Sequence, residues 1–270
     1  MKKFIIPVDF SDTSKNAAIF AAKLSRDTPE SQLILYHVFD KLSAGADGTP
    51  LYNDIHSRAN ISIAALNNLK SELQSITSAP VICIAEPGQL ADNLEKIVRR
   101  NGIDLVIMGM NGSTKLEQLV IGSSTLKVVR KDSFPVIIIP PGTNYHAFQK
   151  AVFVSDLKDV ESSIPIASLR RVLEIFKPEL HILHIKEEKE GDLRAEKQKL
   201  DDMLEEFHPI HATVNDHDFT KGIGAYISRK AANLMITIPK RHNFLTNLFK
   251  PLHTSKLAYH SHVPILTIHE

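Results

Sequence analysis

The sequence predicts an α/β protein in which parallel β-sheets are covered by helices on both faces. Three observations carry this prediction: short apolar runs rich in β-branched residues, amphipathic stretches between them, and a recurrence of the whole pattern later in the chain. Unbroken apolar runs of this length are typical of strands buried on both faces. Regular alternation of such strands with helices is typical of a parallel sheet.

The first part of the chain contains five predicted strands and four predicted helices. The strands are residues 4–8, 33–38, 81–84, 105–108 and 136–139. The first helix is expected to begin at a cap formed by Thr13 or Ser14, and the third to end at the cap pair Asn101-Gly102. The fourth follows Gly122. The second has an apolar stripe that comprises Ile61, Ala64, Leu66, Leu69 and Leu73.

The pattern of the first part recurs in the second. Two pairs of segments share an offset of 147 residues, 4–9 with 151–156 and 33–38 with 180–185. Two further pairs share an offset of 129 residues, 103–107 with 232–236 and 134–139 with 263–268. Two constant offsets indicate a duplicated unit with one net deletion. We therefore expect two domains, residues 1–141 and 142–270, joined at the linker Pro140-Pro141-Gly142-Thr143.

Composition excludes several classes of protein. Among 270 residues, 32 Lys and Arg balance 31 Asp and Glu, which gives no electrostatic reason to expect nucleic acid or an anionic membrane as partner. Cys83 is the single cysteine, so an intrachain disulfide and a cysteine-rich zinc site are excluded. No stretch approaches the length of a membrane span, and the apolar run near the start ends at Asp9, too early for a signal peptide. These features predict a soluble, cytoplasmic protein.

The most informative motif begins where the fourth strand ends. Gly109 directly follows that strand, Gly112 comes next in the loop, and Gly122 directly precedes a helix. Glycines let backbone N–H groups approach a phosphate closely, and a helix N-terminus adds N–H donors and a partial positive charge. The hydroxyls of Ser123, Ser124 and Thr125 can cap the helix and donate to phosphate oxygens. The motif favours phosphate binding, and turn and cap chemistry alone is the simpler alternative.

Two other strands end at the same predicted edge of the sheet. Asp9 ends the first strand, where a carboxylate can bind a ribose hydroxyl or a metal ion or can serve only as a turn residue. His37-Val38 ends the second strand, where backbone groups can contact a base. Because ligands of open α/β sheets bind beyond the carboxyl ends of the strands, these residues belong with the glycine motif in one candidate site.

At this point the sequence resembles the universal stress protein family. Nucleotide-binding members of that family carry G-x2-G-x9-G-[ST], which here is Gly109, Gly112 and Gly122-Ser123 with the spacing intact. The segments Pro7-Val8-Asp9-Phe10-Ser11 and Phe134-Pro135-Val136 also fit. The resemblance implies two tandem open parallel five-stranded sheets of order 3-2-1-4-5, Rossmann-like and similar to adenine nucleotide alpha hydrolases. It also implies pairing of the two domains through their last strands.

The resemblance further implies that the first domain binds an adenine nucleotide. The expected ligand is ATP or another adenine nucleotide, with Mg²⁺ as a candidate companion, in a regulatory, stress-linked role. No catalytic residue and no metal ligand is assigned, so any ATP hydrolysis is expected to be slow. By position, Asp9 and Val38 would contact adenine or ribose, and the glycines and serines would hold the phosphates. The full candidate set is Pro7, Asp9, Phe10, Ser11, Val38, Met108, Gly109, Gly112, Gly122, Ser123, Ser124 and Thr125.

The second copy departs from the nucleotide-binding pattern. At the 129-residue offset, Ile238 stands in place of Gly109, Arg241 in place of Gly112, and Pro251-Leu252 in place of Gly122-Ser123. Proline has no N–H, and the other side chains occupy space that a phosphate needs. Asp156 is kept, but we expect no ATP binding of the family's kind here. The loop is basic, and a solvated surface loop is its simplest interpretation; its cations are Lys240, Arg241, His242 and Lys250.

The cysteine and the histidines have simple structural interpretations. Cys83 lies in an apolar run and is expected to be an inert core thiol. Ten of the 13 histidines follow residue 180, but neither His208 and His211 nor His260 and His262 has a zinc-helix spacing. We expect these histidines on surface loops.

Two other functions stay open alongside nucleotide binding. A nucleotide-free tandem would present a surface to a partner protein, with the segment 41–50 acting as a lid or filling the first site. Co-purified nucleotide, found by mass spectrometry, would exclude that alternative. A hydrolase or transferase is the other, and turnover well above that of a glycine-loop variant would favour it. Homodimerisation would need a surface other than the paired last strands.

Overall fold

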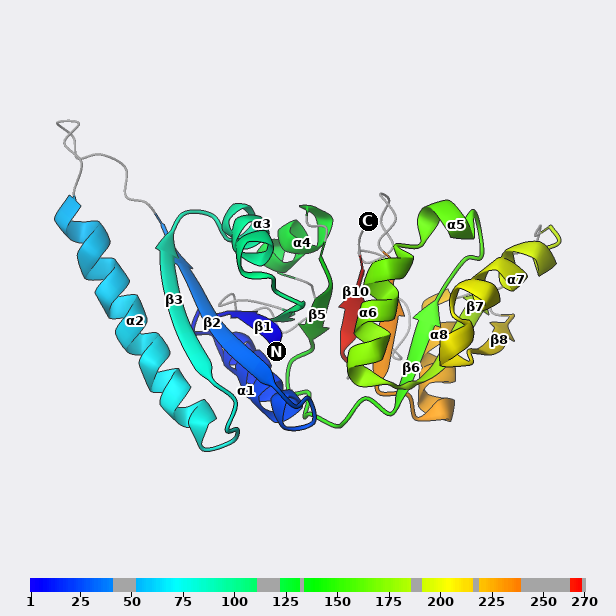
Figure 1. Ribbon diagram of the computed structural model, residues 1–270, viewed down its shortest axis with the longest axis horizontal. Coiled ribbons are helices and arrows are strands. Elements are labelled where there is room, and N and C mark those ends of the chain that lie inside the picture. The colour runs from blue at the N-terminus through cyan, green and yellow to red at the C-terminus, as the bar shows by residue number, and fades with distance from the viewer. Residues whose placement is uncertain are drawn as a thin grey trace.

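The computed structural model describes residues 1–40, 52–110, 122–131, 134–185, 191–215, 219–238 and 263–268. Their strands form one mixed sheet that runs the length of the molecule, with helices on both faces (Figure 1). We call the strands β1–β5 with their helices the first half and β6–β10 with theirs the second half. This confirms the predicted α/β class.

Strands and helices alternate in both halves. The first half contains β1 (Lys2–Pro7), α1 (Asp12–Arg26), β2 (Ser31–Phe39), α2 (Tyr52–Gln74), β3 (Val81–Pro87), α3 (Leu90–Asn101), β4 (Leu105–Gly109), α4 (Ser123–Lys131) and β5 (Val136–Ile139). The second half contains β6 (Lys150–Val154), α5 (Val160–Ser163), α6 (Ile166–Phe176), β7 (Glu179–Ile185), α7 (Arg194–Met203), the 3₁₀ turn η1 (Glu205–Phe207), β8 (Ile210–Val214), α8 (Phe219–Lys230), β9 (Leu234–Thr237) and β10 (Ile265–Thr267).

The order of the strands is β3-β2-β1-β4-β5-β10-β9-β6-β7-β8. Each half therefore has the expected order 3-2-1-4-5, and neighbours within a half are parallel. Two separate sheets were expected, but the halves form one continuous sheet. They join because β10 pairs with β5 in antiparallel register, with Ile265 opposite Ile138 and Thr267 opposite Val136. Backbone groups at these two edges thus bond to each other, and ten strands form one sheet.

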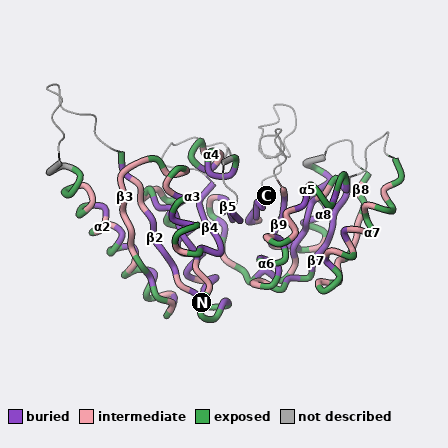
Figure 2. Tube along the Cα trace, turned by 45° about the horizontal axis from the view of Figure 1, so that its top comes forward, coloured by how far each residue is buried: buried purple, intermediate pink, exposed green. Residues whose placement is uncertain are grey.

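Two hydrophobic layers sandwich the sheet. On one face α1, α2, α6 and α7 pack against residues such as Phe4 and Phe153, and on the other α3, α4 and α8 pack against residues such as Ile5 and Val152. Figure 2 shows buried chain along the strands and exposed chain on the outer sides of the helices. All four residues of β5 are buried. Each such side chain contributes about 1.5–3 kcal/mol to folding relative to an exposed one.

Of the two outermost strands, β3 does not follow the prediction of burial on both faces, and β8 was not among the predicted strands. β3 and β8 each have only one neighbour in the sheet, and they leave Ile82 41% and Ile210 44% exposed. Cys83 was expected in the core; it packs against the core but is only partly buried, and burial raises the pKa of its thiol despite nearby Lys70. On α2, Ile61 is 69% exposed and Ala64 is exposed as well, so of the predicted apolar stripe Leu66, Leu69 and Leu73 are buried.

Local signals at helix ends are partly as predicted. Gly102 ends α3 in the left-handed conformation, with φ at 59°, where glycine is favoured. The cap of α1 is Ser11, not Thr13 or Ser14, because the chain stays extended through Ser11 and its hydroxyl accepts the Ser14 N–H. A serine three residues before the N–H that it accepts is the usual capping geometry.

The halves share local contacts at the offset of 147. The Nδ1–H of His37 donates to the Val8 carbonyl at 2.6 Å, and that of His184 donates to the Ser155 carbonyl at 3.1 Å. Phe10 and its counterpart Leu157 both have positive φ, 64° and 52°. Bulky residues rarely adopt this conformation, so its recurrence after β1 and β6 marks one shared turn.

One helix differs between the halves. The continuous α1 corresponds to α5 and α6, which are separated at Ile164-Pro165. Proline has no N–H to donate to the preceding turn and its ring crowds that turn, so the helix stops and restarts. The second half therefore follows the pattern of the first, except that two helices, α5 and α6, replace one continuous helix.

A junction of aromatic and polar contacts joins the halves beside the β5–β10 pair. The Phe148 ring lies between Phe20 of α1 and Phe176 of α6, with centroids 6.0 and 4.9 Å away. Arg171 of α6 forms an ion pair with Asp104, which also accepts the Lys3 backbone N–H at 2.7 Å. The two halves are thus held by side chains as well as by the sheet.

Candidate functional site

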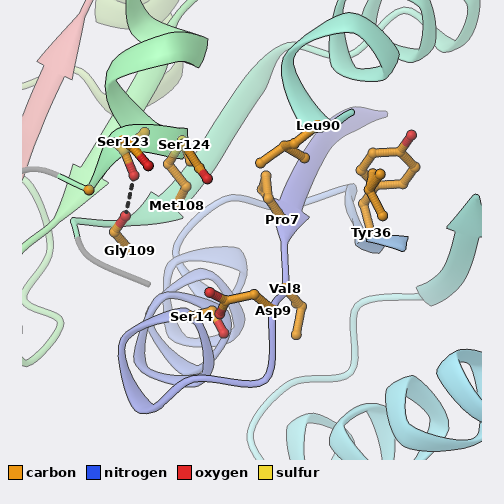
Figure 3. A pocket seen from close by; sticks show the side chains of 13 residues that line it. Pro7, Val8, Asp9, Ser14, Tyr36, Leu90, Met108, Gly109, Ser123 and Ser124 are labelled. Atoms are coloured by element: carbon orange, nitrogen blue, oxygen red, sulfur yellow. Dashed lines mark hydrogen bonds between the residues drawn. The ribbon is translucent and has the colours of Figure 1, made fainter. Parts of the chain in front are cut away.

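A cavity of about 300 Å³ opens at the carboxyl ends of β1, β2 and β4 (Figure 3). It lies where β1 and β4 are neighbours and successive strands change direction across the sheet, the usual ligand position in doubly wound folds. The first turns of α3 and α4 and the start of α1 contribute the rest of its walls. The lining residues are Pro7, Val8, Asp9, Ser14, Tyr36, Val38, Leu90, Met108, Gly109, Gly122, Ser123, Ser124 and Thr125.

Asp9 supplies the one charged side chain among the described residues that line the cavity. Its Oδ1 accepts the Ser11 hydroxyl and, at 3.1 Å, the Ser11 backbone N–H. Burial works to raise the pKa of Asp9, but the hydrogen bonds from Ser11 and Ser14 outweigh it and hold the pKa below its ordinary value. At neutral pH this side chain is therefore an anion that accepts hydrogen bonds and donates none.

Replacing Ser11 by alanine is expected to cost about 1 kcal/mol of stability, because α1 loses its cap. The same change is expected to raise the pKa of Asp9, which loses its hydroxyl donor. A depressed pKa stabilises the fold above the unfolded pKa, and this contribution is lost as pH falls through the folded value. Acidification should therefore cost the variant less stability than it costs the intact protein, because the depressed pKa of Asp9 contributes less in the variant.

Chemical denaturation as a function of pH and a carbon-13 NMR titration of the Asp9 carboxyl group measure the two effects. Ser71→Ala is the matched control, because the Ser71 hydroxyl bonds only to the carbonyl one turn earlier in α2. An unchanged Asp9 titration in Ser11→Ala contradicts the role given to this hydroxyl.

The opposite wall of the cavity is the N-terminus of α4. The first helical bond runs from the Leu126 N–H to the Gly122 carbonyl, at 2.9 Å. The N–H groups of residues 123–125 precede it and point out of the helix end. Ser123 and Ser124 expose their side chains, while the buried Thr125 hydroxyl donates to the Gly109 carbonyl at 3.0 Å. This wall offers donors and a partial positive charge to an anion.

Packing requires glycine at position 109, in addition to the place of Gly109 in the cavity wall. A Cβ atom at this position would lie 2.7 Å from the Thr13 carbonyl oxygen and 2.8 Å from its carbon. These are backbone atoms of α1, which cannot move aside as a side-chain tip can. Glycine is thus required for β4 to end against the first turn of α1, whatever the cavity holds.

A model of the universal stress protein family matches residues 1–140. The chain belongs to that family. Universal stress protein MJ0577 of Methanocaldococcus jannaschii is 28% identical over 157 residues, covering 51% of this chain and 94% of that protein.

Solved structures resemble this universal stress protein along its whole length. A universal stress protein from Archaeoglobus fulgidus has a TM-score of 0.70 at 15% identity and covers 99% of this chain and 96% of its own. The functionally unknown protein PA1789 from Pseudomonas aeruginosa has a TM-score of 0.61 at 14% identity and covers 100% and 92%. At these identities the likeness shows a common fold.

The structure brings most of the predicted site residues of this universal stress protein together. Pro7, Asp9, Val38, Met108, Gly109, Gly122, Ser123, Ser124 and Thr125 line the cavity. Phe10 and Ser11 do not, because the left-handed turn at Phe10 directs its ring to His37, 4.8 Å away between centroids, and Ser11 caps α1. Gly112 and the segment 41–50 lie outside the described residues.

Four lining residues were missed by the sequence analysis. Ser14 was considered only as a helix cap, and Leu90 was not considered as a site residue. Val8 and Tyr36 lie in apolar strand runs, where nothing distinguishes a core residue from a cavity wall. The available signal was position, since all four lie within a turn of a strand's carboxyl end or a helix start.

The prediction that the later histidines lie on surface loops is wrong for three of them: His181 and His184 in β7, and the partly buried His211 in β8. His181 and His184 are 1% and 5% exposed, within β7. The His181 ring contacts the Tyr226 hydroxyl at 2.8 Å and a Glu179 oxygen at 2.7 Å, and these partners make its burial tolerable. A second set of histidines, His242, His253, His260 and His262, lies outside the described residues.

Searches for metal and membrane features add two findings. The described part of the chain contains no cluster of three or more His, Cys, Asp or Glu side chains placed to hold a metal ion. None of its helices is long and apolar enough to cross a membrane.

Proposed function

We propose that the cavity of the first half binds an adenine nucleotide, most simply ATP, and that the protein has a regulatory, stress-linked role. The observation that carries this proposal is the contrast between the two ends of one cavity. Donor groups gather at the α4 end and apolar side chains at the β2 and α3 end, with Asp9 between them (Figure 3). A nucleotide has the same sequence of parts: phosphates, ribose and base.

The α4 end suits phosphates. The N–H groups of residues 123–125 and the exposed hydroxyls of Ser123 and Ser124 are neutral donors at the positive end of a helix. The described lining residues include no Lys, Arg or His side chain to neutralise a triphosphate. This supports the proposal that Mg²⁺ accompanies the phosphates and offsets their charge.

The middle and far parts suit a nucleoside. Asp9 is an anionic acceptor, which fits a ribose hydroxyl donor. Val38 and Leu90 provide apolar surface against which a flat base can pack. The fit of the described residues to the ligand therefore extends over all three parts.

Calorimetric titration with ATP and Mg²⁺ tests this assignment on the full chain. The intact protein is expected to bind, and the double variant Gly122→Val, Ser123→Ala to bind at least ~10-fold more weakly, because one buried or well-placed polar contact commonly controls such a factor. Gly191→Val with Ser162→Ala is the matched control in the second half, where a Cβ at Gly191 meets nothing within 4 Å. Equal binding by the intact protein and the first variant overturns the assignment.

We further propose that residues 142–270 form a degenerate second domain that serves pairing or partner binding. Ile238, which replaces the first motif glycine, is half-buried and packs against the core. The antiparallel β5–β10 pair supports a pairing role, because it occupies both last strands within one chain. The other replaced positions, Arg241, Pro251 and Leu252, lie outside the described residues.

From the composition of the chain, we also propose that the protein is located in the cytoplasm.

A further inference from the structure

The turn that carries Asp9 contains a strained residue. Phe10 directly follows Asp9 and has φ at 64°, in the left-handed region that residues other than glycine rarely adopt. Such a conformation persists only where surrounding contacts hold it, and it is often found at functional sites. The contacts that hold this turn therefore determine where the Asp9 carboxylate lies.

The side chain of His37, near the end of β2, contacts this turn on both sides of Asp9. Before Asp9, the Val8 carbonyl oxygen lies 2.6 Å from Nδ1 of His37. A carbonyl oxygen can only accept, so Nδ1 must carry the hydrogen and donate it. After Asp9, the Phe10 ring packs against the His37 ring, with centroids 4.8 Å apart and planes tilted by 44°. One side chain thus holds both neighbours of Asp9.

The bond to Val8 fixes the backbone that leads into Asp9. The Val8 carbonyl and the Asp9 N–H belong to one planar peptide group, so a bond to the oxygen restrains the whole group. The peptide group before it is restrained as well, because the Val8 N–H donates to the Tyr36 carbonyl at 2.8 Å. Two consecutive residues of β2 therefore restrain the two peptide groups that precede the Asp9 side chain.

The hydrogen bonds of the Asp9 carboxylate depend on that backbone position. Its Oδ1 accepts the Ser11 hydroxyl and the Ser11 N–H, and Ser14 supplies a further bond. Figure 3 shows the Asp9 and Ser14 side chains next to each other where α1 begins. Burial works to raise the pKa of Asp9, and these bonds outweigh it. A rotation of the peptide group before Asp9 would move the carboxylate away from these donors.

The second half of the chain shows which contact belongs to the first half alone. His184 donates from Nδ1 to the Ser155 carbonyl at 3.1 Å, so this hydrogen bond is part of the turn that both halves share. Leu157 occupies the position of Phe10, so the contact between two aromatic rings is particular to the first half. The turn that borders the described cavity thus has an additional contact with its histidine.

We propose that His37 is a positioning residue of the nucleotide site. It holds the turn formed by Val8, Asp9 and Phe10, so that the Asp9 carboxylate is already placed to accept a hydrogen bond when the ligand arrives. This inference rests on the proposed function, since it assumes that the cavity binds a nucleotide and that Asp9 contacts it. His37 is not among the residues that line the cavity, so it acts on the ligand through Asp9.

Two variants separate the contacts of His37. His37→Phe keeps a ring beside Phe10 and removes the donor, whereas His37→Asn keeps an N–H donor close to the position of Nδ1 and removes the ring. In calorimetric titration of the full chain with ATP and Mg²⁺, His37→Phe is expected to bind about 10-fold more weakly, the scale of one lost hydrogen bond to a charged group. His37→Asn should recover part of that loss.

His184→Phe is the matched control, because it removes the same bond from the turn of the second half. It should lose stability in thermal unfolding and still bind ATP as tightly as the intact protein. A His37→Phe protein that binds ATP as tightly as the intact protein overturns the proposal. So does an equal loss of affinity in His37→Phe and His184→Phe, since that result would reflect stability alone.

A double-mutant cycle tests whether His37 acts through Asp9. Asp9→Asn is expected to weaken ATP binding, and His37→Phe added to Asp9→Asn should weaken it no further. Residues that act on the ligand independently would instead give losses that add up. Additive losses therefore contradict the proposal.

A carbon-13 NMR titration of the Asp9 carboxyl group tests the positioning role without any ligand. The pKa of Asp9 is expected to rise in His37→Phe, because the carboxylate loses donors that lower it, and to stay unchanged in His184→Phe. An unchanged pKa in His37→Phe overturns the positioning role whether or not ATP binds. Intact protein that binds no ATP overturns the proposed function, and the titration then decides separately whether His37 positions Asp9.

Discussion

Replacing Phe148 by alanine is expected to lower the free energy of unfolding by about 3–5 kcal/mol, the usual result of truncating a buried aromatic side chain. Phe148 is only 6% exposed and lies at the junction between Phe20 of α1 and Phe176 of α6. Truncation leaves a cavity between two helices of different halves, which the paired strands β5 and β10 prevent from closing. The lost contacts are therefore not recovered by local collapse.

Urea denaturation followed by circular dichroism measures this effect. Phe148→Leu keeps part of the volume and should lose a smaller part of the stability. Tyr145→Phe is a second control, since it removes only the hydrogen bond from the Tyr145 hydroxyl to Asp27 and should cost about 1 kcal/mol. A loss of less than about 1 kcal/mol in Phe148→Ala would show that the junction does not stabilise the protein.

Gly109→Ala is expected to destabilise the protein by about 1–3 kcal/mol or more, the range for forcing an atom into a packed region. The added Cβ meets the Thr13 carbonyl group of α1 at 2.7–2.8 Å, so β4 or the start of α1 must shift. Gly109 also lines the cavity next to Gly122. The shift should therefore weaken ATP binding as well.

Two control variants separate this clash from the general effect of replacing a glycine. Gly191→Ala meets no atom within 4 Å and should leave stability almost unchanged. Gly102→Ala also has space, but its φ of 59° suits glycine, so a loss of about 1 kcal/mol is expected. Thermal unfolding measures the relative stability of the three glycine variants. Similar stability for Gly109→Ala and Gly191→Ala would contradict the packing role of Gly109.

Much of the fold and the site follows from local sequence. Runs such as residues 136–139 are apolar at every position, and only a strand with a covered layer on each side hides them all. Glycines and hydroxyls at the ends of such runs predict an anion site, because the parallel arrangement brings strand ends to one edge. Nine predicted residues consequently line one cavity.

Other features depend on neighbours that are distant in sequence. Tyr36 reads as one more core residue of a strand, and only the tertiary structure places it among the residues that line the cavity. His181 reads as a polar residue for the surface, but Glu179 and Tyr226 satisfy its ring inside the protein. Ile82 is as apolar as its neighbours and is exposed only because β3 is the last strand.

The sequence by itself determined most of the strands and the place of the glycine motif at a strand's carboxyl end, while its family resemblance implied the order of strands within each half. These depend on hydrophobic period, turn chemistry and the rules of parallel connection, all of which act over short stretches of chain. Only the tertiary structure decided the antiparallel register that joins the two groups of strands, that Gly109 must be glycine for the sake of Thr13, and that Tyr36 is among the residues lining the cavity. Each of these is a contact between segments far apart in sequence, whose approach no local pattern specifies.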